Sequence, residues 1–231
     1  MPLLLNIDTA TEHASICISR QDEVQGLVVS TEQKNHASFV QPAIQQLINQ
    51  SGYQLKDMDA IAVTAGPGSY TGLRVGLASA KGICYALDKP LILVNTLEVM
   101  AQAILSHLQS TGVHIDPSTL LCPLIDARRM EVFTGVYSSS LVEVQAPNAL
   151  IIDAFSFSSL LNSHPVIFSG SGQPKLKELI SHPNASFLNL QHNASHLAIR
   201  SIIAYQSNHF ANLAYSEPIY VKEFFNPPKK V

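Results

Sequence analysis

The chain has 231 residues, of which 46% are apolar and 13% are charged, and its formal net charge is −3. This length allows one large domain or two smaller lobes, and the apolar share suffices for a substantial core. The slightly negative charge excludes a large phosphate-binding surface, because such a surface needs clustered lysine and arginine.

Strands and helices alternate along the first half of the chain. Short apolar or alternating segments predict strands, and apolar residues at a spacing of 3.6 predict helices. Pro42 falls within the first helical pattern, where an irregular turn is expected. The expected strands are Leu3–Ile7, Ser15–Ser19, Val24–Ser30, Asp59–Thr64 and Leu91–Val94, and the expected helices are about His36–Gln50 and Thr71–Leu87.

The second half repeats this plan. A strand expected at Leu120–Ile125 ends in Asp126, as the first strand ends in Asp8, and Glu131–Tyr137 returns as its neighbour. A later strand, Pro165–Phe168, runs into a glycine-containing loop, and a helix opens near Asn193 or Ser195. The repeated order predicts an α/β protein built from a duplicated lobe.

The turn after the first strand carries a carboxylate and hydroxyls at Asp8, Thr9 and Thr11. Such oxygen atoms suit a phosphate and its magnesium ion. The same side chains also suit hydrogen bonds to the backbone of the turn. Both interpretations stay open, and the second Asp turn at Asp126 favours a nucleotide-binding ancestry.

Gly66-Pro67-Gly68-Ser69 connects a strand end to a helix start. Free amides and the helix dipole favour an anion at such a place, and glycine allows close approach. The run lacks the Gly-Lys-Ser/Thr ending of a Walker A loop. Its glycines could equally serve packing. Gly170 and Gly172 form the corresponding loop in the second half.

Neither histidine nor cysteine patterns predict a metal or catalytic site. His192 and His196 have the spacing of a zinc pair but lack the glutamate of a metallopeptidase, so a structural role is favoured. Among the other histidines, only His36 at a helix start is kept as a candidate. The three separated cysteines predict neither disulfides nor thiolate zinc sites. No Gly-x-Ser-x-Gly elbow is present.

The longest apolar runs are shorter than a membrane span, and the N-terminus shows no basic leader. The three separated cysteines suit a reducing compartment. Together these features predict a cytosolic protein. The only adjacent basic residues are Arg128–Arg129 and Lys229–Lys230. A nucleic acid would therefore be held mostly by another protein.

The combined motifs resemble the TsaB family, also called YeaZ. The resemblance is close over roughly the first 137 residues and looser beyond. Its motifs, in chain order, are Ile7–Thr11, Asp59–Val63, Gly66–Arg74, Gly76–Gly82, Ile125–Val132, Gly170–Gly172 and Glu217–Val221.

The resemblance implies a two-lobed, duplicated actin-like fold of the ASKHA and RNase H-like type. The first lobe is expected to span 1–110 plus about 195–231, and the smaller second lobe about 111–194. It also implies a role in forming N6-threonylcarbamoyladenosine (t6A) at adenosine 37 of tRNA, beside TsaD, TsaE and an adenylate synthase. The tRNA would be reached only through the complex, and a homodimer is allowed when TsaD is absent.

The catalytic paralogue TsaD carries two metal-binding histidines where this chain has Thr96 and Met100. A hydroxyl and a thioether are poor ligands for the divalent ions concerned. The resemblance therefore implies a non-catalytic subunit that requires no metal and no cofactor, with weak ATP or ADP binding confined to the complex.

The resemblance also places TsaD on the helices of the first lobe. The residues expected at this interface are His36, Phe39, Val40, Tyr70, Arg74, Leu77, Ala78 and Lys81. Two other classes stay open as alternatives: a small-molecule kinase with the same fold, and a metallopeptidase-like (glycoprotease) enzyme.

Overall fold

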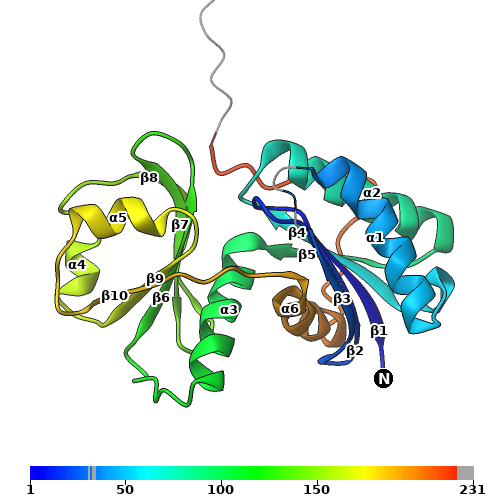
Figure 1. Cartoon of the computed structure of the whole chain (residues 1–231), viewed down its shortest axis with the longest axis horizontal. Helices are drawn as coiled ribbons and strands as arrows, with labels where there is room; N and C mark the ends of the chain where they lie inside the picture. Colours follow the sequence, from blue (N-terminus) through cyan, green and yellow to red (C-terminus); the bar gives the residue numbers. More distant parts are fainter. Residues whose placement is uncertain (31, 33–34, 223–231) are drawn as a thin grey trace, which may run out of the picture.

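The computed structural model describes residues 1–30, 32 and 35–222. Two five-stranded mixed sheets each form the centre of a lobe, and Figure 1 shows the lobes side by side. None of the helices in this part of the chain is both long and apolar enough to span a membrane.

The first sheet has the order β3-β2-β1-β4-β5. In it, β1 pairs antiparallel with β2 and parallel with β4. The strands are β1 (Leu3–Asp8), β2 (Ser15–Arg20), β3 (Glu23–Val29), β4 (Ala60–Gly66) and β5 (Leu91–Asn95).

The second sheet repeats this topology in the order β10-β9-β6-β7-β8. Its central strand β6 pairs antiparallel with β7 and parallel with β9, as β1 does with β2 and β4. The strands are β6 (Leu120–Asp126), β7 (Glu131–Ser138), β8 (Glu143–Ile151), β9 (Val166–Ser169) and β10 (Ala185–Leu188). The predicted α/β class and duplicated actin-like lobe are confirmed.

Helices cover both faces of the first sheet. On one face, α1 (His36–Ser51) and α2 (Tyr70–Leu87) enclose a core with β1 and β4, and on the other face lies α6 (Ala194–Gln206). Every residue of β1 and β4 is buried because neither face meets solvent. This explains why both strands have continuous apolar runs. A short 3₁₀ turn, η1 (Leu55–Asp57), precedes β4.

The second lobe is covered by the short helices α4 (Ser158–Leu161) and α5 (Gln173–Leu179) on its outer face. Its inner face packs on α3 (Thr96–Ser110), which also contacts α6 and β5 of the first lobe. Figure 1 shows α3 and α6 between the two sheets. These two helices therefore join the lobes.

The sequence did not predict α3. It packs against both lobes, and its buried residues include Leu97, Val99, Ala101 and Ile104, which point in several directions. Such a helix lacks the single apolar stripe from which helices are predicted. The sequence also predicted an irregular turn at Pro42, whereas α1 continues through this residue without a break.

Beyond α6, residues 211–222 contain a turn at 213–215 and no helix, and we call this segment the C-terminal strap. The amide of Ala211 donates to the Leu91 carbonyl on the edge of β5, at 2.8 Å, and that of Ile219 donates to Ala65, at 2.7 Å. Lys222 then pairs with Glu131 of β7 at 2.6 Å. The strap thus leads from the first lobe to the second. Residues 223–231, including Lys229–Lys230 and the end of the expected first lobe, lie outside the described residues.

Candidate functional site

Asp8 is the last residue of β1, and its side chain is buried in the first lobe. Its Oδ1 accepts hydrogen bonds from the amide of Ala10 at 3.2 Å and from the hydroxyl of Thr64 at 2.9 Å. Thr9 is also buried, and its hydroxyl donates to the Gly72 carbonyl at 2.8 Å. The polar side chains of Asp8 and Thr9 therefore hold the turn and fasten it to α2.

The second carboxylate oxygen of Asp8 faces an imidazole. His192 Nε2 lies 3.2 Å from Asp8 Oδ2, within ion-pair range but without the alignment of a hydrogen bond. Burial alone raises the pKa of Asp8, but the positive charge of His192 and the bonds from Ala10 and Thr64 outweigh it, so this pKa is lowered. When its ring is protonated, His192 thus acts as the counter-charge of a buried carboxylate.

His192 and His196 do not converge on a common point. His192 precedes α6, as expected from the sequence, and turns to Asp8. His196 Nδ1 accepts from the Asn193 amide at 3.1 Å and so helps to cap α6. Burial and the charge of His192 lower the pKa of His196. Both imidazole rings thus interact with residues of the fold and do not share a site.

The glycine loop after β4 is filled by neighbouring backbone. The Ser69 amide donates to the Ala10 carbonyl at 2.7 Å, and the Gly72 amide donates to Ser69 Oγ at 3.3 Å. A Cβ at Gly68 would overlap the Ala10 carbonyl oxygen, and one at Gly66 would overlap that of Ile219 in the strap. These glycines permit close backbone packing, and the amides of Ser69 and of Gly72 in the first turn of α2 are already bonded.

The cleft between the lobes is narrow. A cavity of about 50 Å³ lies there, lined by Thr11, Glu12, His13, Met100, Gly170, Ser171, Leu190, Gln191 and His192. Small-molecule sites have volumes of about 300–1,000 Å³, whereas this space fits a few water molecules. This cavity is too small for a nucleotide.

Thr96 and Met100 lie one turn apart at the start of α3, on the same face. Thr96 is fully buried, and its hydroxyl has no hydrogen-bond partner among the described residues. Met100 lines the cavity, and a Cβ at Gly170 would overlap its methyl group. Its side chain therefore closes the space between α3 and the glycine loop of the second lobe.

Asp126 corresponds to Asp8 in position but not in environment. Its side chain is 40% exposed and pairs with Lys175 at 2.6 Å. Gly170 has a positive φ of 108°, and a Cβ on Gly172 would come within 2.8 Å of Val132. The second loop thus also serves packing. Within the described ranges, no cluster of three or more His, Cys, Asp or Glu side chains could hold a metal ion.

The expected interface residues separate into buried and accessible groups. Val40 and Leu77 belong to the first-lobe core, and His36 is buried with its Nε2 2.7 Å from the Thr11 carbonyl. These three side chains are not on the surface. Phe39 is half-buried, whereas Ala78 is exposed.

Tyr70, Arg74 and Lys81 share their surface with the strap. Arg74 lies 4.0 Å from the ring centre of Tyr70, and its Nε donates to the Tyr220 hydroxyl at 3.1 Å. The Tyr70 and Tyr220 rings are 5.5 Å apart. Lys81 Nζ donates to the Ser216 carbonyl at 3.0 Å. The surface of α2 is therefore completed by the strap, which sequence reasoning did not place there.

Comparison with known proteins identifies the family. The model of the family "TsaD: tRNA N6-adenosine threonylcarbamoyltransferase" matches residues 12–223. A Bacillus subtilis protein named "tRNA threonylcarbamoyladenosine biosynthesis protein TsaB" is 33% identical over 180 residues, which span 77% of this chain and 74% of that protein. The chain belongs to the TsaB family.

Other relatives agree with this assignment. The Escherichia coli TsaB is 33% identical over 134 residues, 58% of this chain and 54% of that protein. A TsaD-type transferase from Erythrobacter litoralis is 39% identical over 108 residues, 45% of this chain and 31% of that protein. The solved YeaZ from Pseudomonas aeruginosa has a TM-score of 0.78 at 23% identity and covers 95% of this chain and 100% of that one, so it shares the fold.

Proposed function

We propose that this TsaB-family chain is a non-catalytic scaffold and activator subunit required for t6A formation at adenosine 37 of tRNA. It binds TsaD as a heterodimer and enables the TsaB–TsaD–TsaE complex, and it meets tRNA within that complex. Support comes from family membership and from relatives that carry the name of a tRNA threonylcarbamoyladenosine biosynthesis protein.

The observation that carries the non-catalytic role is the pair Thr96 and Met100 on α3. We propose that they replace the metal ligands of the transferase. One is a buried hydroxyl and the other a thioether whose methyl packs against Gly170. Neither is a good ligand for a hard or borderline divalent ion. Filling this space with a methyl group stabilises the contact between the lobes instead.

The cleft supports the proposal that no cofactor is required. Its cavity is about 50 Å³, and the Asp8 carboxylate, which would face a magnesium ion, has the His192 ring 3.2 Å away. ATP or ADP binding by the isolated chain is expected to be weak. The lobes must first separate to enlarge the cavity, and the contact between Asp8 and His192 must break. Binding in the complex requires the partner to stabilise an open cleft.

The outer face of α2 supports the proposed TsaD surface. Arg74, Ala78, Gly82 and Tyr85 are exposed along it, and Tyr85 is 83% exposed. A Cβ at Gly82 would meet no atom within 4 Å, so packing inside the lobe does not explain this glycine. Glycine in a helix interior costs about 1 kcal/mol relative to alanine. A partner helix that approaches closely at Gly82 would account for it.

Reconstitution tests the activator role. TsaD, TsaE, the adenylate synthase, ATP, threonine, bicarbonate and unmodified tRNA are combined with and without this chain, and t6A is measured by nucleoside mass spectrometry. We expect t6A only with the chain present. Full modification without it would contradict the role, as would a stoichiometric zinc, iron or manganese ion in the purified chain.

Replacement of Gly82 by arginine tests the interface. We expect G82R to abolish the heterodimer in light scattering and to reduce t6A formation, because the side chain blocks close approach while its Cβ meets no atom of its own lobe. Gln109→Arg is the control, since it adds the same charge at an exposed helical position near the end of α3, away from α2. Undiminished TsaD binding by G82R would contradict this surface.

A further inference from the structure

The turn between β6 and β7 has an unusual backbone. Arg128 and Arg129 are consecutive residues with positive φ angles of 70° and 52°. This region is uncommon for residues other than glycine, and turns that need it usually carry Gly, Asn or Asp. Strain of this kind points to a role of the side chains beyond the turn itself.

The turn is held firmly. Asp126 Oδ1 accepts from the Arg128 amide at 2.6 Å and from Lys175 Nζ at 2.6 Å. Lys175 Nζ also donates to the Arg129 carbonyl at 2.5 Å. The amide of Ala127 donates to the Glu131 carbonyl at 3.1 Å. Because the backbone is bonded on both sides, the two guanidinium groups are presented from a fixed base.

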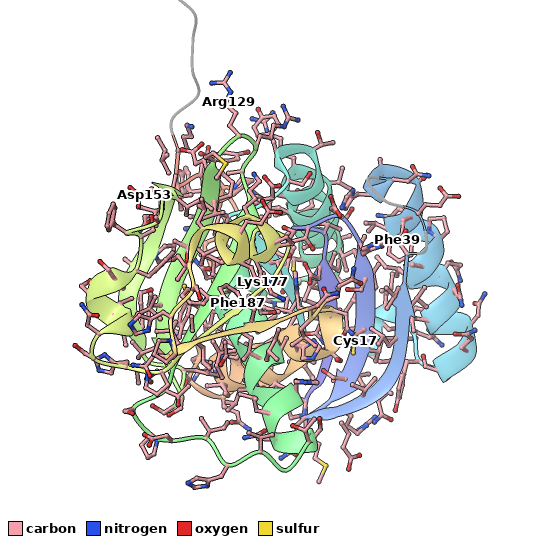
Figure 2. The ribbon with its side chains drawn as sticks, turned by 60° about the vertical axis from the view of Figure 1, so that its left-hand side comes forward. Cys17, Phe39, Arg129, Asp153, Lys177 and Phe187 are labelled. Carbon is pink, nitrogen blue, oxygen red and sulfur yellow. The ribbon has the colours of Figure 1, made fainter. Side chains whose placement is uncertain are left out.

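Both arginines are exposed, and neither forms an ion pair within the described part of the chain. Figure 2 shows the Arg129 side chain at the outer edge of the molecule, pointing away from the second lobe. The acidic neighbours Asp126 and Glu131 are neutralised by Lys175 and Lys222. Arg128 and Arg129 therefore form a local cationic patch, which we call the tip, on a chain whose net charge is −3.

This tip borders the proposed TsaD surface. Tyr220 of the strap packs on Tyr70 at the start of α2, and Lys222, two residues later, pairs with Glu131 at the base of the turn. A polyanion that the partner holds at this face would be attracted by the positive charges of both arginines. Arginine presents several donors in a planar fork that matches phosphate oxygens.

We propose that Arg128 and Arg129 contact tRNA backbone phosphates within the complex. This rests on the proposed function, because that function brings tRNA to this face. The sequence alone predicted only indirect contact with tRNA. The strained turn adds a contact made by this chain that contributes to tRNA affinity, whereas the partner supplies most of the binding surface.

The test compares tRNA affinity of the reconstituted heterodimer by fluorescence anisotropy at 50–200 mM salt. For Arg128→Gln/Arg129→Gln we expect roughly tenfold weaker binding near 100 mM salt, and a slope of log K against log salt smaller by about 1.5, since each phosphate contact contributes about 0.7–0.9. Arg128→Gly/Arg129→Gly should lose the same affinity without a lower unfolding temperature, because glycine adopts positive φ readily.

Lys56→Gln/Lys177→Gln is the control, since both lysines are exposed and lie outside the turn between β6 and β7. The two substitutions remove the same amount of positive charge as the arginine variants. It should leave affinity and slope almost unchanged. Equal losses in both double variants, or no loss in the arginine variants, would overturn the proposal. So would weaker TsaD binding without a specific loss of tRNA, which would indicate an acidic protein partner.

Light scattering of the wild-type proteins separates this inference from the proposed function. If no heterodimer forms, the proposed function fails. The tip is then tested on the full chain alone, where the arginine variants must still weaken salt-dependent tRNA binding more than the lysine control does. Equal binding by wild type and the arginine variants in that assay would also overturn the proposal.

Discussion

The Asp8 carboxylate and the His192 imidazole meet at 3.2 Å, although one residue ends the first strand and the other precedes the last helix. Their side chains are 1% and 6% exposed. A buried carboxylate needs such a partner, because burial without one is costly. The pair therefore ties the segment between β10 and α6 to the centre of the first sheet.

Removal of His192 should destabilise the protein. At a pH at which the imidazole is protonated, His192→Ala removes the counter-charge of Asp8, and breaking a buried pair in this way costs about 3 kcal/mol. Asp8→Asn/His192→Ala should recover part of the loss, since no charge stays buried. Guanidinium unfolding of the wild type, both single variants and the double variant measures this. A His192→Ala variant as stable as the wild type would show that the pair contributes nothing.

Acid should weaken the protein through Asp8. The pKa of this carboxyl is lowered in the folded state relative to an ordinary value of 3.8, so its stabilising contribution is present above that pH. The contribution is lost as pH falls from about 4 through the lowered folded-state pKa. Urea unfolding between pH 7 and pH 3 should therefore show a smaller decrease in stability for Asp8→Asn than for the wild type. Equal slopes would contradict this assignment.

Two glycines of α2 should respond oppositely to alanine. A Cβ at Gly72 would overlap the Thr9 carbonyl oxygen, so Gly72→Ala should lower the free energy of unfolding by about 1–3 kcal/mol. Gly82→Ala meets no neighbour and should raise it by about 1 kcal/mol through helix propensity. Denaturant titration of both variants provides the comparison. Similar effects at the two positions would mean that packing against the Asp8 turn is not the reason for Gly72.

The cysteines should be inert in the folded protein. Burial raises the pKa of Cys17 and Cys122 to about 12 and that of Cys84 to about 11. The thiolate is the nucleophile, so at pH 8 the reactive fraction is about 0.1% or less. We expect no labelling by a thiol reagent at pH 8 and complete labelling of the three cysteines in denaturant. Rapid labelling of the native protein would indicate local opening.

Local patterns were sufficient for most of the fold. Continuous apolar runs predicted β1, β4 and β6, and apolar stripes predicted α1 and α2 within one or two residues of their observed ends. The repeated Asp turn predicted the duplication. The same patterns missed α3, because a helix buried against both lobes shows no single polar face, and they did not predict β8 or the short elements α4, α5 and β10.

The sequence by itself determined the α/β lobes and their duplication, because these depend on residues close together in the chain. Only the tertiary structure decided what surrounds each side chain. It placed His192 on Asp8, filled the first glycine loop with Ala10 and Ile219, and buried Val40 and Leu77 beneath the expected interface. These contacts join distant segments, and packing of the whole chain determines them.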